Sequence, residues 1–421
     1  MHEPLDHRTL YRLPWSLSDN PIAWLEPTQA CNLACDGCYR ENVKQHKSLD
    51  EVQADLDVFD RLRTYDGVSI AGGDPLMHPQ IIEIVRMIAR SERKPIINTN
   101  GLALTEPLLR QLRDAGLVGL TFHIDSKQGR PGWRDNNEIQ LCELREQLAR
   151  MVARVGGLAC AFNATVYDDT LKYVPELVDW AARNIDIVQT MVFITFRAAA
   201  CDAFDYYCGA KKVDMEPLVY LASEKRRTDI TSREVVDVIR DRFPDYAPCA
   251  YLNGTESPDS FKWLIAMRIG DGENVYGYAG PKFMETVQAG YHVISGRYLS
   301  YADVSLLHAG RATMAAGLWD AGLRSAAKRY VSAGLRDPRV LLRPLHMQAV
   351  VHIQPIDVTE DGRDSMCDGC PDMTVHEGRL VWSCRLEEPR KFGRFLRAVP
   401  RGPKGEGPTP VVPAVPTRGA H

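Results

Sequence analysis

The chain has 421 residues, enough for one large domain or two. It is 45% apolar and 25% charged, ordinary values for a globular protein with a sizeable core. A net charge of -4 does not indicate a general nucleic-acid binder, and no apolar run approaches the ~20 residues of a membrane span. Residues 1–20 are polar and interrupted by prolines, so we expect an irregular lead-in without a targeting segment. A reducing, cytoplasmic location follows, in which clustered cysteines serve as ligands or catalytic groups.

The first distinctive motif follows a predicted strand at residues 22–27. Cys31, Cys35 and Cys38 stand there in a C-x3-C-x2-C spacing. Thiolates at this density select iron–sulfur clusters, zinc or copper(I). Three cysteines on one loop can hold three irons of a [4Fe–4S] cluster and leave the fourth open to a non-protein ligand. Two alternatives remain at this point: another metal, or a thioredoxin-like pair formed by Cys35 and Cys38.

Strands and helices are predicted to alternate between residues 22 and 196. Ser48 and Glu51 form a capping box that should open the first helix, and Gly116 should end a later one. Such alternation predicts parallel strands joined by crossover helices, in about six units. Later strands are expected at 67–71, 95–99, 117–124, 158–166 and 187–196, and later helices at 79–89, 106–115, 139–155 and 171–183.

Glycines and polar residues stand where several of these strands end. In barrels of parallel strands, functional sites lie at the C-terminal ends of the strands. Residues 72–75 read Gly72-Gly73-Asp74-Pro75; the glycines allow close backbone approach, and Asp74 can accept hydrogen bonds from an ammonium group. Asn100, Asp125 and Asn163 lie at or near the ends of the next three strands. Each of these polar residues could instead form a turn or cap a strand.

The motifs at residues 31–38 and 72–75 together resemble those of the radical S-adenosylmethionine (SAM) superfamily. The resemblance covers roughly residues 20–200 and implies a partial (β/α)6 TIM-like barrel. It implies a [4Fe–4S] cluster on the three cysteines, with SAM chelating the open iron through its amino and carboxylate groups. Gly72, Gly73, Asp74 and Pro75 would contact the SAM amino group, and Asn100, Asp125 and Asn163 its ribose and carboxylate. The family motif is usually GGEP, and an aromatic residue usually stands at the position of Gly37.

The resemblance also implies an activity. The reduced cluster, supplied with electrons by flavodoxin or ferredoxin, would cleave SAM to methionine and a 5′-deoxyadenosyl radical, which abstracts hydrogen from an organic substrate. Only about twenty residues precede the first strand, too few for a fused peptide-binding domain. We therefore expect a small metabolite or natural-product intermediate as substrate. A peptide-modifying maturase, a non-catalytic iron–sulfur or zinc scaffold and a thiol redox protein are the alternatives, and no catalytic residue is assigned.

A second cysteine group stands near the C-terminal end of the chain. Cys367, Cys370 and Cys384 have a C-x2-C-x13-C spacing, and a fourth ligand could be Cys249, or His376 if the metal is zinc. The group resembles the SPASM/twitch extensions that carry an auxiliary [4Fe–4S] cluster, although their full cysteine pattern is not present. A second cluster, a structural zinc and unligated cysteines all remain open.

The remaining sequence predicts the division of the chain into parts. After residue 196 the alternation fades, and the expected elements are a helix at 234–243, one or two alanine-rich helices at 302–335 and a strand at 350–356. We predict a lead-in at 1–20, a barrel core at 21–200 and an α+β extension at 201–399. Residues 400–421 are rich in proline and glycine and should form a disordered tail.

Overall fold

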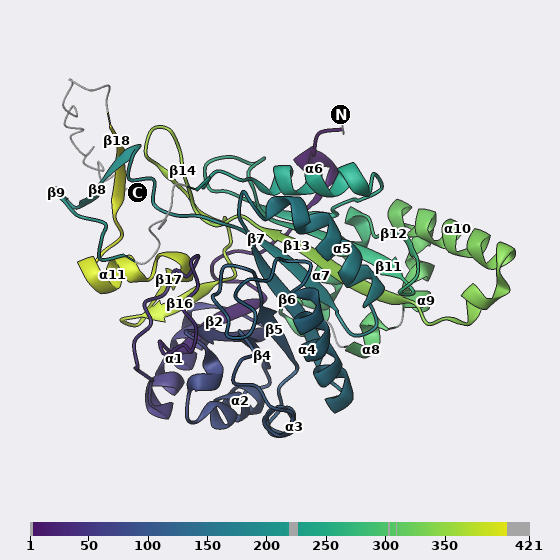
Figure 1. The fold of residues 1–421 in the computed structure, drawn as a ribbon, viewed down its shortest axis with the longest axis horizontal. Helices are drawn as coiled ribbons and strands as arrows, with labels where there is room; N and C mark the ends of the chain where they lie inside the picture. The colour runs from purple at the N-terminus through teal and green to yellow at the C-terminus, as the bar shows by residue number, and fades with distance from the viewer. Residues whose placement is uncertain (1–2, 219–225, 302–303, 309, 402–421) are drawn as a thin grey trace, which may run out of the picture.

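One mixed sheet forms the centre of the molecule, and six consecutive strands of it are parallel (Figure 1). The computed structural model describes residues 3–218, 226–301, 304–308 and 310–401. Each of the six strands pairs with the next in chain order. They are β2 (Ile22–Thr28), β3 (Gly67–Gly72), β4 (Lys94–Thr99), β5 (Gly119–His123), β6 (Ala159–Val166) and β7 (Thr190–Thr195).

Five helices connect these strands and cover the outer face of the sheet. The capping box at Ser48 and Glu51 is present at the start of the first. On β6, Phe162 packs outward on Trp180 of the last of these helices, whereas Ala161 and Asn163, its neighbours on alternate positions, face a cavity. The predicted α/β partial barrel is therefore confirmed. The helices are α1 (Leu49–Leu62), α2 (Ile81–Arg90), α3 (Glu106–Asp114), α4 (Cys142–Val155) and α5 (Val174–Arg183), with 3-10 turns η2 (Pro75–Met77) and η3 (Leu171–Tyr173).

The second half of the chain extends the same sheet, which the sequence did not predict. The predicted strand at 350–356 is present as β13 (His346–Ile353), and it pairs in parallel with β7. Residues 1–20 contain η1 (His7–Thr9) and a short strand, so they are not irregular throughout. The added strands are β11 (Phe261–Gly270), β10 (Ala250–Asn253), β1 (Tyr11–Arg12) and β12 (Val275–Tyr278).

A run of helices lies between β12 and β13. The alanine-rich region is divided into several pieces, not one or two, because Asp320 accepts a hydrogen bond from the Leu323 amide and starts a new helix there. No helix in the described ranges has the length and apolar character that a membrane span requires. The helices of the second half are α6 (Ser232–Arg242), α7 (Pro281–Ser295), α8 (Val304–Leu307), α9 (Gly310–Thr313), η4 (Met314–Leu318), α10 (Ala321–Arg336) and η5 (Pro338–Leu342).

The C-terminal residues return to the first strand of the barrel. In Figure 1 the yellow C-terminal hairpin lies beside the purple β2 and α1, and β16 contacts β2. Residue 400 belongs to a strand, and 402–421 of the predicted tail lie outside the described residues. The elements are β14 (Asp357–Val358), β15 (Asp364–Ser365), β16 (Met373–His376), β17 (Arg379–Trp382), η6 (Ser383–Arg385), α11 (Glu387–Phe392) and β18 (Arg397–Pro400), which pairs with β8 (Phe204–Cys208) and, through it, β9 (Lys211–Lys212).

Candidate functional site

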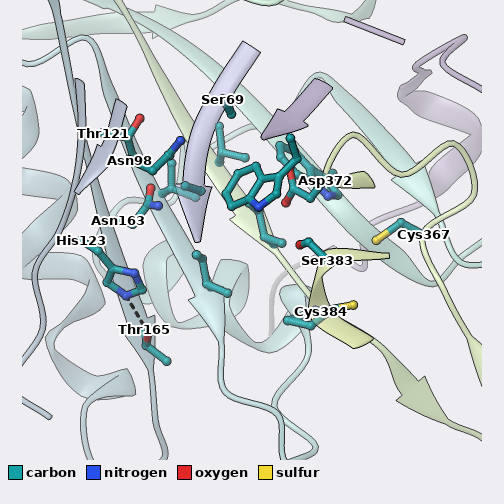
Figure 2. A pocket seen from close by; sticks show the side chains of 18 of the residues that line it. Ser69, Asn98, Thr121, His123, Asn163, Thr165, Cys367, Asp372, Ser383 and Cys384 are labelled. Carbon is teal, nitrogen blue, oxygen red and sulfur yellow. Dashed lines mark hydrogen bonds between the residues drawn. The ribbon is translucent and has the colours of Figure 1, made fainter. Parts of the chain in front are cut away.

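A cavity of about 1060 Å³ occupies the inside of the partial barrel. Both predicted cysteine groups line it, and so do most of the polar residues predicted at strand ends. Figure 2 shows strand residues on one wall, with Cys367 and Cys384 on the other. The predicted residues on the wall are Cys31, Cys35, Cys38, Gly72, Gly73, Asp74, Asn100, Asp125, Asn163, Cys367, Cys370 and Cys384, whereas Pro75 and Cys249 do not line it.

The first cysteine loop is held by hydrogen bonds at both of its ends. Asn42 accepts from the Cys31 amide and donates to the Cys31 carbonyl, both at 3.0 Å. The Arg40 amide points at the Cys38 sulfur, 3.4 Å away. Burial raises the pKa of the Cys31, Cys35 and Cys38 thiols. The three thiols of the loop therefore line the cavity, and hydrogen bonds hold the loop backbone in place.

Gly72 and Gly73 are required by contact with the base of this loop. Gly72 has φ +104°, and a Cβ there would lie 2.4 Å from the Thr28 carbonyl oxygen. A Cβ on Gly73 would lie 2.3 Å from the Ala30 carbonyl oxygen. The close backbone approach expected from the sequence is thus an approach to residues 28–30, immediately before Cys31. The two glycines let β3 end against the start of the cysteine loop.

Gly72→Ala should lower the free energy of unfolding by about 2–4 kcal/mol, because it adds both backbone strain and a steric clash. Gly378→Ala is the matched control: Gly378 has φ +72°, but nothing lies within 4 Å of its Cβ position. That substitution should cost only about 1 kcal/mol. Urea unfolding of both variants measures the difference, and equal losses would contradict the proposed contact with Thr28.

Asp74 holds the end of β4 in place. Its carboxylate accepts hydrogen bonds from the Thr99 hydroxyl at 2.8 and 2.9 Å, from the Asn100 amide at 2.9 Å and from the Leu76 amide at 2.9 Å. Burial raises the pKa of Asp74 despite these donors. The sequence suggested an acceptor for an ammonium group; the structure adds a positioning role, because Asp74 fixes the residue beside the cysteine loop.

The three other predicted polar residues lie in different environments. The Asn100 side-chain amide donates to Asn32 at 2.7 Å and lies 3.7 Å from the Cys31 sulfur. Asp125 is buried, which would raise its pKa, but hydrogen bonding and charge from His123 hold that pKa below its usual range. The Oδ1 atom of Asn163 is buried and has no hydrogen-bond partner among the described residues. Of the three, Asn163 therefore has an unused acceptor beside the cavity.

Gly37 is also explained by its surroundings. A Cβ at this position would lie 2.5 Å from the Tyr167 hydroxyl and 3.5 Å from the Phe196 ring. The Tyr167 and Phe196 rings pack with centroids 5.0 Å apart, and both residues line the cavity. Aromatic rings from the ends of β6 and β7 thus occupy the space next to Cys38 that a larger residue 37 would need.

A stripe of polar side chains on the inner face of the strands was not predicted from the sequence. Asn98, Thr121 and Thr165 line the cavity, and Figure 2 shows them on the same wall as His123 and Asn163. The Thr165 hydroxyl and His123 Nε2 are 2.9 Å apart. Polar residues at every second position of an otherwise apolar strand were the available signal, because alternate side chains point to opposite faces of a sheet.

The second cysteine group is assembled against the first strand. Arg63, at the end of α1, donates to the Cys370 carbonyl at 2.9 Å and to the Ile22 carbonyl. A hydrogen bond with Cys367 and burial raise the pKa of the Cys370 thiol, and Cys384 lies near enough to add to this effect. Asp372 also lines the cavity, and burial raises its pKa to about 7.

The structure does not bring Cys249 to this group. Cys249 is fully buried in an apolar cluster with Leu13, Trp15 and Met284, whereas Cys367 and Cys370 pack in a separate cluster with Met373. The prediction of Cys249 as a fourth ligand therefore disagrees with the structure. That prediction rested on residue type alone. Cys249 directly precedes β10, and its side chain is buried in the core. His376, the alternative for zinc, does not line the cavity either.

A buried ion pair connects the two cysteine groups. The Arg40 guanidinium donates to Glu26 at 2.7 Å, and both side chains are 3% exposed. The same guanidinium donates to the carbonyl of Ser383, the residue before Cys384. Arg40 also donates its amide to Cys38. One residue therefore contacts both groups.

The residues on the cavity wall are chemically suited to the cofactors that the sequence predicts. Three thiols on one loop match a cluster with an open iron, and the unpaired Asn163 oxygen can accept a hydrogen bond from SAM. As the side chains stand, no three His, Cys, Asp or Glu residues in the described ranges are close enough together to hold a metal ion. The cysteine side chains would have to turn toward one another to bind a cluster.

Comparison with known proteins gives matches confined to part of the chain. Residues 25–181 match the family model described as the Radical SAM superfamily. The AdoMet-dependent heme synthase of Oleidesulfovibrio alaskensis is 27% identical over 183 residues, covering 41% of this chain and 46% of its own. The GTP 3′,8-cyclase of a Synechococcus species is 30% identical over 153 residues, covering 33% and 43%. The PqqA peptide cyclase of Gluconobacter oxydans is 24% identical over 195 residues, covering 42% and 52%.

Among solved structures, SuiB of Streptococcus suis bound to S-adenosylmethionine matches with a TM-score of 0.39 and 15% identity. The match covers 54% of this chain and 48% of SuiB. The chain spans about half the length of the curated relatives it matches. The match of residues 25–181 begins on β2 and ends on α5, so it includes the first cysteine loop and excludes the second.

Proposed function

We propose that the chain is a radical SAM enzyme that cleaves SAM reductively and abstracts hydrogen from an organic substrate, because residues 25–181 match the family model of the Radical SAM superfamily. The observation that carries the proposal is the convergence of Cys31, Cys35 and Cys38 with the ends of β3 to β6 on one cavity. Functional sites of barrels with parallel strands lie at the C-terminal ends of the strands. A [4Fe–4S] cluster on the three cysteines would supply the electron that cleaves the bound SAM.

The chain's own residues bind and orient in this proposal. Asn163 offers its unpaired oxygen to SAM, and Asp125, held ionised by His123, offers a second acceptor. Asp74 keeps Asn100 beside Cys31. The apolar inner residues of β7 and β13 limit water around the reacting atoms, which protects a reactive intermediate. A reducing partner such as flavodoxin or ferredoxin and a cytoplasmic location belong to the same proposal.

The substrate is proposed to be a small molecule. A cavity of about 1060 Å³ is close to, and slightly above, the upper limit of roughly 1,000 Å³ for small-molecule sites. The matched relatives are divided on this point: by their names, one acts on GTP and another on the peptide PqqA. A peptide-modifying maturase is therefore the second candidate, and the wide cavity that continues to Cys384 favours testing it.

The second cysteine group is proposed to hold an auxiliary [4Fe–4S] cluster, or zinc, in a SPASM-like extension. Cys367, Cys370 and Cys384 line the same cavity as the first group, which supports a role near the substrate. With Cys249 buried elsewhere, a fourth ligand would come from substrate, solvent or another residue of the wall. The division into a core at 21–200 and an extension at 201–399 is part of this proposal.

The test is anaerobic reconstitution followed by an iron count and an assay for 5′-deoxyadenosine with SAM and dithionite. About eight irons with nucleoside formed would support both clusters. About four irons with nucleoside would support the first site and turn the second into a zinc or structural site. Failure to bind iron would contradict the proposed function. Iron without nucleoside would be followed by measuring SAM binding, and absence of SAM binding would contradict it as well.

A further inference from the structure

Among the described residues, the most exposed large apolar side chains lie between residues 293 and 342, and two of them, Val293 and Ile294 at the end of α7, are 84% and 88% exposed. Leu318, Leu335 and Leu342 are 82–83% exposed. They lie on a lobe that we define as residues 310–343, comprising α9, η4, α10 and η5. Among the described residues outside 293–342, no large apolar side chain is more than 46% exposed. Singly exposed apolar residues are common on protein surfaces, but a concentration of them marks an interaction site.

The lobe is a packed unit whose inner and outer faces differ. Leu323 and Ala326 of α10 are buried against β12 and its neighbours. Val331 and Leu335, four residues apart and so on one side of α10, are 55% and 82% exposed. Arg311 donates to the Leu341 and Arg343 carbonyls and ties α9 to η5. In Figure 1 α10 lies at the end of the molecule, far from the C-terminal strands β16, β17 and β18.

The charge of the lobe is opposite to that of the whole chain. Residues 310–343 contain seven arginines and lysines and two aspartates, in a protein with a net charge of -4. Asp320 is 1% exposed and caps α10, so it adds little negative charge at the surface. Lys328, Arg336 and Arg339 are exposed and form no ion pair with a described residue. The surface of the lobe therefore carries both basic groups and exposed leucines.

We propose that residues 310–343 dock on a membrane surface that contains anionic lipid. Leucine and tryptophan side chains insert at the boundary between headgroups and acyl chains, while lysines and arginines contact anionic headgroups. Trp319, 46% exposed beside Leu318, has the amphipathic ring that favours this boundary. Basic side chains make a second copy of this chain the poorer occupant, because two such lobes would repel each other.

The proposed docking surface adjoins the cavity, because helices next to it or within it line the cavity wall. Leu307 of α8 and Ala312 of α9 line the cavity, as do Phe283 and Met284 of α7. The lobe that carries the exposed leucines thus begins at the apolar wall of the cavity. Docking would place this wall next to the lipid surface.

The test uses the full chain and vesicles, and requires neither iron nor SAM, so its outcome is independent of the proposed function. The protein should float with vesicles of phosphatidylcholine and phosphatidylglycerol in equal amounts, less so as salt rises, and not with phosphatidylcholine alone. The variant K328E/R336E/R339E should bind at least about tenfold more weakly, given the loss of attraction per basic residue. The variant L318S/L335S/L342S should lose binding to a similar extent.

The matched control is L17S/L102S/I139S, which replaces three apolar residues that are 41–46% exposed elsewhere on the protein. It should bind vesicles as the unchanged protein does. All variants change exposed side chains, and circular dichroism checks that they fold. No flotation of the unchanged protein, equal binding to phosphatidylcholine alone, or an equal loss in the control variant would overturn the proposal. So would conversion of a dimer to a monomer by L318S/L335S/L342S with vesicle binding unchanged.

Discussion

Replacing Cys31, Cys35 and Cys38 together by alanine should remove the iron of the first site and abolish formation of 5′-deoxyadenosine. The three thiols lie on one loop whose backbone is fixed by Asn42, so the loop keeps its shape while losing its ligands. Any iron that the second cysteine group binds should remain. The measurement is the iron count and the nucleoside yield after anaerobic reconstitution, compared with the unchanged protein.

The matched control replaces three other cysteines, Cys142, Cys201 and Cys208, by alanine. None of them lines the cavity. This variant should keep its full iron content and nucleoside yield, apart from a modest loss of stability. If the first variant retained both iron and nucleoside, the site would not lie on the cysteine loop. If the control variant lost them equally, cysteine content and not position would explain the effect.

Arg40→Met should lower the free energy of unfolding by about 3–5 kcal/mol, because it leaves the Glu26 carboxylate buried without its partner. Methionine retains much of the side-chain volume, so the loss reports the uncompensated charge. The double variant Glu26→Gln/Arg40→Met removes that charge and should recover a large part of the loss. Urea unfolding monitored by circular dichroism gives all three values.

Arg150→Met is the comparison for the same chemistry at the surface. Arg150 pairs with Glu146 on α4 with side chains 60% and 38% exposed, and such a pair contributes only about 0.3–0.5 kcal/mol. A loss for Arg40→Met no greater than for Arg150→Met would show that the buried pair does not stabilise the two cysteine groups. Iron counts on the Arg40→Met protein would then be expected to match those of the unchanged protein.

The six parallel strands were predictable because each gives a local signal. Each is a short apolar run bounded by turn residues or a helix cap, and the structure reproduces them within a few residues. The extension of the sheet was not predictable in the same way. β1 pairs with β10, about 240 residues away, and β13 returns to β7, so the pairing depends on tertiary structure that no local pattern encodes.

The candidate site could likewise be predicted only where the signal is local in the sequence. The cysteine loop and the polar ends of β3 to β6 were visible in the spacing of residue types, and the structure brings them to one cavity. The contacts of Gly72 with Thr28 and of Asp74 with Thr99 could not be inferred, because they involve the neighbouring strand. Cys249 shows the converse: its residue type suggested a ligand, but burial among apolar side chains decided its environment.

The contact between Arg40 and the carbonyl of Ser383 also bears on how the protein is made. Residue 383 is synthesised 343 residues after residue 40, and domains generally fold as units during synthesis. The first cysteine loop therefore leaves the ribosome without the segment that covers its buried arginine. Iron delivered at that stage would reach a cavity that still lacks the segment around Ser383. Maturation of the proposed metal site should thus begin only after residue 383 has been synthesised, and a nascent chain stalled before that residue should be poor at retaining iron.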